Sequence, residues 1–208
     1  MTLETSQNGT MYPRHRLEAL VDGIFAVAMT LLVLEVRLPD GANPRSDHEL
    51  VAVLVSVLPK LGPYALSFVV LGIRWRELVA ERTTQDEVNK RYVNWSLANL
   101  LLVTFVPFST LLIGSYATLA PAIWLYSANL AGMAICSWLI GRNAPKGERS
   151  KAEETAGLLV FLFAAAVTAG LGWLHTPWAP MGFALNALAP PVEQYIRARE
   201  RKSANSGD

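Results

Sequence analysis

Charged residues interrupt or flank one apolar segment of the chain, RLEALVDGIFAVAMTLLVLE. Arg16 begins the segment, Asp22 follows about two turns later, and Glu35 ends it, so the twelve residues 23–34 between the two acids carry no charge. An ionisable side chain inside a membrane helix is costly and faces other protein or water rather than lipid. Arg16 and Asp22 can therefore either hold the helix in place through polar partners or sense protons or ions.

Arg16 and Asp22 need partners on other segments, because residues six apart on a helix do not stack directly. We expect these partners among the polar residues of neighbouring apolar runs, namely Asn94, Asn99 or Ser67. A structural polar network is our first interpretation of the two charges, and proton or ion sensing is the second.

The uncharged part of the segment has one ordered face. Residues at i, i+3, i+4 and i+7 share one side of a helix, and here they are Val27, Thr30, Leu31 and Leu34. Asp22 lies well round the cylinder from Val27. On its own, an apolar stripe of this kind is typical of a surface that faces lipid or the protein core.

The composition of the chain predicts that a membrane surrounds these elements. Of its 208 residues, 52% are hydrophobic and 17% are charged, which is more apolar and less charged than a soluble protein. We predict an all-α integral membrane subunit of six helices. The first span must include Arg16 and Asp22, because residues 23–34 alone are too short to cross a bilayer. The predicted spans are 16–36, 59–75, 92–113, 123–140, 155–174 and 178–196.

Two prolines set the predicted start of the second span. Pro59 and Pro63 interrupt the apolar run 51–73, and a proline inside a helix removes a backbone donor and crowds the preceding turn. We therefore predict a short interfacial helix from about Glu49 to Leu58, followed by a separate span that begins at Pro59.

Most basic residues lie on one side of the predicted membrane. The N-terminal tail, the connectors after the second and fourth spans, and the C-terminal tail together hold 15 of the 18 Lys and Arg residues. The positive-inside rule places these segments in the cytoplasm together with both termini, which requires an even number of spans. We predict a cytoplasmic tail 1–15, disordered up to residue 13, a six-span domain 16–196, and a cytoplasmic tail 197–208.

No arrangement of residues for catalysis stands out, so we do not predict an enzyme. The chain has neither a Gly-rich phosphate loop nor a His-Glu-x-x-His motif, and its three histidines lie in different predicted tails and loops. Cys136, the one cysteine, lies inside an apolar run and is interpreted as a small packing residue. Lys and Arg are not gathered with aromatic residues on one surface, which argues against a nucleic-acid partner.

The first apolar segment resembles a known family. The pattern Arg16-x-x-x-Leu20-Val21-Asp22, followed by GIFAVAMTLLVLEVRLP, is similar to the first helix of the transmembrane protein 175 family. Its members are bacterial and lysosomal potassium channels that lack the usual carbonyl-lined filter. The family signature has Phe and Ser where this chain has Leu20 and Val21. Further similarity covers 59–75, 99–116 and 122–133, and it weakens toward the C-terminus.

The resemblance implies that the apolar stripe lines a pore. Val27, Leu31 and Leu34 match the stacked hydrophobic pore rings of the family. Thr30 matches a pore-adjacent threonine. One subunit offers a single first helix, so the resemblance implies a homotetramer around a central pore in a prokaryotic cell membrane. Such a channel passes potassium ions across the lipid bilayer passively, without a cofactor or a resident metal.

Two departures from the family pattern change what we expect. The family motif that corresponds to Arg16 and Asp22 forms a polar network that holds the first helix, and Val21 in place of Ser removes one hydroxyl from it. The network should therefore be thinner in this chain. Val27 stands where family members usually have Ile or Leu, so the first ring should be slightly wider, with weaker ion discrimination or a leakier closed state.

Two other functions stay open on the residues. Proline-broken spans and intramembrane charges also occur in secondary transporters, whose flux would be saturable and coupled to an ion. A proton-conducting or purely structural membrane protein would depend on Asp22 far more than on Val27. Separate substitutions of these two residues distinguish the possibilities.

Overall fold

The computed structural model describes residues 11–80, 86–143 and 151–173. In chain order its elements are β1 (Met11–Pro13), α1 (Arg14–Leu31), η1 (Leu32–Glu35), α2 (Asp47–Ala80), β2 (Glu87–Asn89), α3 (Lys90–Ser115), α4 (Ala120–Asn143) and α5 (Lys151–Trp173). Four helical segments in the described part are long and apolar enough to cross a membrane: α1 with η1, α2, α3 and α4. The protein is a mostly helical, multi-pass membrane protein, as its composition predicts.

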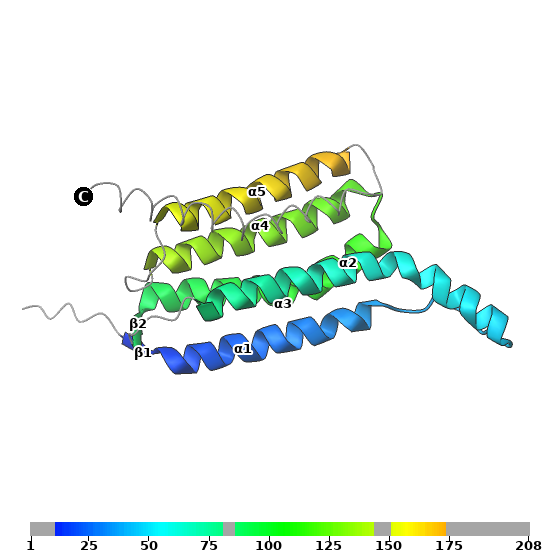
Figure 1. The fold of residues 1–208 in the computed structure, drawn as a ribbon, viewed down its shortest axis with the longest axis horizontal. Coiled ribbons are helices and arrows are strands. Elements are labelled where there is room, and N and C mark those ends of the chain that lie inside the picture. Colours follow the sequence, from blue (N-terminus) through cyan, green and yellow to red (C-terminus); the bar gives the residue numbers. More distant parts are fainter. Residues whose placement is uncertain (1–10, 81–85, 144–150, 174–208) are drawn as a thin grey trace, which may run out of the picture.

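The helices form one bundle around α3. This helix contacts α1, α2 and α4, while α5 packs against α4, so α1 and α5 lie at opposite edges (Figure 1). Large apolar side chains from four helices fill the shared core, among them Phe25, Leu71, Val103 and Met133. Because α1 lies at an edge of the bundle, the other described helices cover only one of its sides.

The second span begins differently from our prediction. The chain is a single helix from Asp47 to Ala80 that runs through Pro59 and Pro63, instead of a short interfacial helix followed by a separate span. A proline in a helix costs one hydrogen bond and bends the axis but does not have to end the helix. Figure 1 shows the first part of α2, in cyan, bending away from the bundle.

Local hydrogen bonds stabilise the N-terminus of α2. Ser46 Oγ accepts a hydrogen bond from the backbone N–H of Glu49 at 3.3 Å, and Glu49 Oε2 accepts one from the backbone N–H of Arg45 at 2.6 Å. This pairing resembles a capping box, which satisfies donors at a helix N-terminus that have no partner within the helix.

A short two-stranded sheet, which the sequence did not predict, ties the start of α1 to the start of α3. Tyr12 of β1 pairs antiparallel with Val88 of β2, and Val88 is fully buried. The backbone N–H of Arg14 adds a hydrogen bond to the carbonyl of Asp86 at 2.9 Å. Residues 11–13 are therefore ordered rather than disordered, because a partner strand that is distant in sequence supplies their backbone hydrogen bonds.

Three of the other predicted spans lie within or overlap helices in the described part of the chain. Helices α3 and α4 include the predicted spans 92–113 and 123–140, and α5 overlaps the predicted span 155–174. The predicted sixth span, 178–196, and the predicted tail 197–208 lie outside the described residues.

Candidate functional site

Helix α1 has two unlike sides. One side carries Leu17, Phe25, Ala28 and, at the start of η1, Leu32, all of which are buried. The other side carries the residues whose spacing resembles a pore face: Val27 is 57%, Leu31 41% and Leu34 58% exposed. The predicted stripe is thus a surface that the subunit's own helices leave uncovered.

Thr30 lies on the same exposed surface. Its hydroxyl donates to the carbonyl of Val27 at 2.8 Å, one turn back along the helix. This bond uses the hydroxyl proton and leaves the oxygen lone pairs as acceptors. Among the four predicted stripe residues, Thr30 is therefore the one that can offer an oxygen to a passing cation.

Asp22 has a partner that the sequence analysis missed. The indole Nε1–H of Trp75 donates to Asp22 Oδ1 at 2.8 Å, which links α1 to α2. Trp75 ends the apolar run of the second span, and Asp22 lies near the start of the first. Because consecutive spans cross in opposite directions, both residues fall at the same membrane face, and this placement could have suggested the pair.

The buried arginine of α1 is Arg14 rather than Arg16. Arg14 is buried, and its Nε donates to Glu18 Oε1 at 2.8 Å, whereas Arg16 is exposed. The two ion pairs described in the structure are Arg14–Glu18 and Arg74–Glu77, and Arg16 belongs to neither. The structure therefore does not bring Arg16 and Asp22 together in one network within the subunit.

The hypothesised partners of Arg16 and Asp22 have separate surroundings. Asn94 is exposed. Ser67 is fully buried and bonds to Thr110 Oγ1 at 2.7 Å and to the hydroxyl of Tyr126 at 2.9 Å. These three hydroxyls connect α2, α3 and α4 in the core and satisfy one another, as buried polar groups require.

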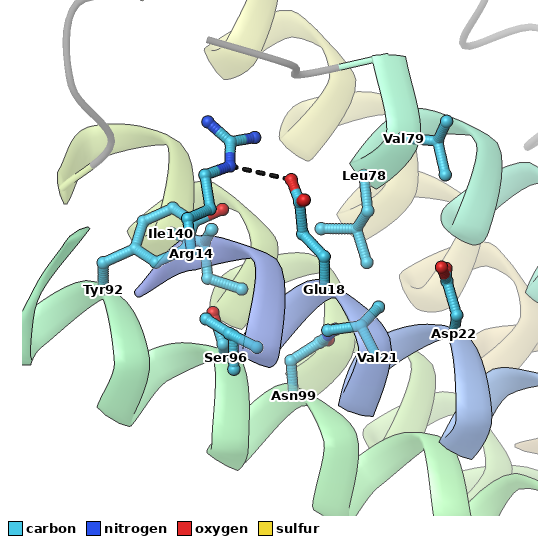
Figure 2. A pocket seen from close by; sticks show the side chains of 11 residues that line it. Arg14, Glu18, Val21, Asp22, Leu78, Val79, Tyr92, Ser96, Asn99 and Ile140 are labelled. Carbon is cyan, nitrogen blue, oxygen red and sulfur yellow. Dashed lines mark hydrogen bonds and ion pairs between the residues drawn. The ribbon is translucent and has the colours of Figure 1, made fainter. Parts of the chain in front are cut away.

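A cavity of about 70 Å³ lies behind α1, on the side away from the exposed stripe. Figure 2 shows Arg14, Glu18 and Asp22 of α1 around it, with Ser96 and Asn99 of α3 below them. Asn99, the third hypothesised partner, thus shares a cavity with Asp22. The remaining lining residues are Leu17, Val21, Leu78, Val79, Tyr92 and Ile140.

Glu35, the acid that ends the apolar segment, lies at the other end of α1. It lines a second, smaller cavity of about 10 Å³ together with Lys60, Tyr64 and Thr110. Its Oε2 is buried and has no hydrogen-bond partner among the described residues. A cavity of this size holds about one water molecule, which is the natural partner for that oxygen.

The part of the chain that carries this site is similar to known proteins. Residues 16–107 match the family model described as endosomal/lysosomal potassium channel TMEM175. This match includes α1, α2 and much of α3, with the exposed stripe, Asp22, Trp75 and Asn99. This part of the chain is similar to the TMEM175 family. The resemblance found in the sequence is therefore confirmed.

Two relatives of the chain are named potassium channels. The chain is 35% identical over 101 residues to a potassium channel of Chamaesiphon minutus and 32% identical over 101 residues to one of Streptomyces collinus. Each alignment covers 49% of this chain. The chain spans about half the length of these curated relatives, 49% and 48% respectively.

A solved TMEM175 structure extends the likeness beyond the first half. The crystal structure described as a lysosomal potassium-selective channel TMEM175 homolog from Chamaesiphon minutus is similar with a TM-score of 0.65 and 27% sequence identity. The superposition covers 89% of this chain and 96% of that one. The fold of the chain is thus similar to that of the TMEM175 homolog even beyond the residues where the sequence resemblance is strongest.

Proposed function

We propose that the chain is the subunit of a potassium-permeable cation channel in which four copies surround a central pore lined by α1. The observation that carries this proposal is the uncovered face of α1, where Val27, Leu31 and Leu34 are exposed while the opposite side is buried. Lipid could cover three apolar side chains equally well, but the stripe also includes the hydroxyl of Thr30. The names of the relatives support potassium as the ion.

The stripe suits a gate that works without binding the ion. At about 1.5 Å of rise per residue, Val27 and Leu34 lie roughly 10 Å apart along the axis, so four copies would form a short stack of apolar rings. Rings of this kind close by losing their water, and an ion that passes must shed hydration water. Potassium sheds water more readily than sodium, so conduction is passive and modestly selective, and it needs neither a cofactor nor a resident metal.

Asp22 and Arg16 have supporting roles in this proposal. Asp22 fixes α1 against α2 through the indole of Trp75, so it holds the pore helix and is not itself in the ion path. Arg16 is exposed near the start of the helix, where it favours the cytoplasmic membrane surface. The proposed subunit has six spans within 16–196 and both termini in the cytoplasm of a cell whose plasma membrane holds the channel, as the distribution of Lys and Arg favours.

Flux through liposomes tests the proposal. Purified protein is reconstituted into potassium-loaded vesicles, and ion efflux is followed down the gradient, with and without replacement of potassium by sodium. We expect potassium-preferring flux that does not saturate in the manner of a carrier. Leu31→Asn, which places an amide in the middle ring, should hydrate the constriction and raise the flux while lowering the preference for potassium.

Leu101→Asn is the matched control. Leu101 of α3 is 71% exposed but lies outside the α1 stripe, so the same substitution there should leave the flux ratio unchanged. Equal effects of the two variants would contradict the pore-face assignment. Saturable flux coupled to a second ion would indicate a transporter. Flux that depends on Asp22 but not on Leu31 would indicate a proton-conducting protein, and the absence of flux would indicate a structural one.

A further inference from the structure

The cavity behind α1 contains a buried acceptor that the channel proposal does not use. Asn99 is 2% exposed, and its Oδ1 has no hydrogen-bond partner among the described residues. An unsatisfied amide oxygen in a protein interior is costly and calls for a partner such as water or an ion. Figure 2 shows the Asn99 side chain rising from α3 toward Val21, whose methyl groups supply no donor.

The charges around the same cavity do not balance. Its charged lining residues are Arg14, Glu18 and Asp22, which carry one positive and two negative charges. Arg14 pairs with Glu18, while the bond described for Asp22 comes from the neutral indole N–H of Trp75. Glu18 and Asp22 are four residues apart, and like charges at that spacing on a helix repel each other. Among the described residues that line the cavity, one negative charge is therefore left over, and it lies on Asp22, which is exposed.

We propose that this cavity binds one small monovalent cation, of the size of potassium or ammonium, between Asp22, Glu18 and Asn99 Oδ1. All three supply oxygen acceptors, and protein oxygens can replace the hydration shell of potassium. A volume of about 70 Å³ accommodates the ion and one or two waters. The cation would balance the excess charge, satisfy the buried amide oxygen and join α1 to α3 on the side away from the pore.

Thermal unfolding of the purified full-length protein tests the site with simple salts. Melting curves are recorded in potassium, ammonium and N-methyl-glucamine chloride at constant ionic strength. A ligand that binds the folded state alone raises Tm with its concentration. We expect potassium and ammonium to raise Tm saturably by roughly 3 °C relative to the bulky cation, the size of shift that one weak site gives a protein of this length.

Variants assign the shift to this cavity. Asn99→Leu and Asp22→Asn should abolish the cation-dependent rise in Tm, and Val21→Ser should reduce it by offering Asn99 Oδ1 a hydroxyl donor from within the chain. Leu31→Asn, on the opposite side of α1, should keep the rise. A rise that survives Asn99→Leu and Asp22→Asn but disappears in Leu31→Asn would overturn the proposal in favour of ions held in the pore.

Tryptophan emission gives a second readout at the site that does not depend on flux. Trp75 bonds directly to Asp22, so a cation beside that carboxylate should shift its emission with the same midpoint as the Tm. Trp75→Phe should remove the spectral change while the rise in Tm persists. An emission that stays constant as potassium is titrated contradicts the cation site, whether or not the vesicles show potassium flux.

Discussion

The two sides of α1 differ in their chemistry. The side that faces the protein carries the polar groups at one end, where Arg14 is buried and Asp22 bonds to Trp75. The side that its own subunit leaves uncovered is apolar along Val27, Leu31 and Leu34. A pore that coordinated ions would place its oxygens on the uncovered side.

This difference separates two tasks along α1. Near the start of α1, Asp22 ties the helix to α2, and the apolar stripe, in our proposal, controls the water in the pore. Substitutions on one side should therefore change stability with little effect on ion preference, and substitutions on the other should do the reverse.

Phe25→Ala should have the largest effect on stability. Phe25 is 1% exposed and belongs to the shared core, so its removal leaves a cavity and should cost about 3 kcal/mol in the free energy of unfolding. Val27→Ala, two residues away on the uncovered side, should cost less than about 0.5 kcal/mol. Unfolding of both variants in detergent measures the difference, and similar losses would mean that α1 does not present two distinct sides.

Trp75→Phe should have an intermediate effect. The substitution keeps an aromatic ring but deletes the N–H that donates to Asp22, and a lost hydrogen bond of this kind costs about 1 kcal/mol. The exposure of Asp22 keeps the loss small, because water can replace the indole. Trp95→Phe on α3 is the control, since Trp95 is exposed to a similar extent. Equal destabilisation by the two variants would argue against a specific tie between α1 and α2.

The sequence could predict the stripe because helical spacing alone determines which residues share a side of α1. Apolar runs likewise predicted the membrane helices that the structure describes. The helix through Pro59 and Pro63 was mispredicted, because local proline chemistry gives the cost of continuing a helix and not the packing that offsets it. The β1–β2 pair was missed because its strands have three residues each and are stabilised by partners more than 70 positions apart.

The polar network was harder to predict than the stripe. Arg14 and Arg16 are two residues apart, so they point to different sides of the helix, and only tertiary packing decides which of them is buried. The partner of Asp22 is an indole, and tryptophan is commonly read as an apolar or interfacial residue although it also carries a hydrogen-bond donor. Searching for donors at the same membrane face, and not only for small polar residues, would have included Trp75.

Val27→Ile should have the smallest effect on the free energy of unfolding, and its main effect should be on ion flux. Adding a methylene to the uncovered side leaves the core untouched, so Tm should not change measurably. In a ring of four copies the added bulk narrows the constriction, which should lower basal flux and raise the potassium-to-sodium ratio about twofold, or about 0.4 kcal/mol in barrier difference. Vesicle flux measures both quantities, with Val69→Ile on α2 as the matched control, because Val69 is exposed to a similar extent and gains the same methylene. If basal flux and ion preference both stay at their original values, Val27 does not form the first ring, and the pore-facing residues of α1 must begin further along the helix.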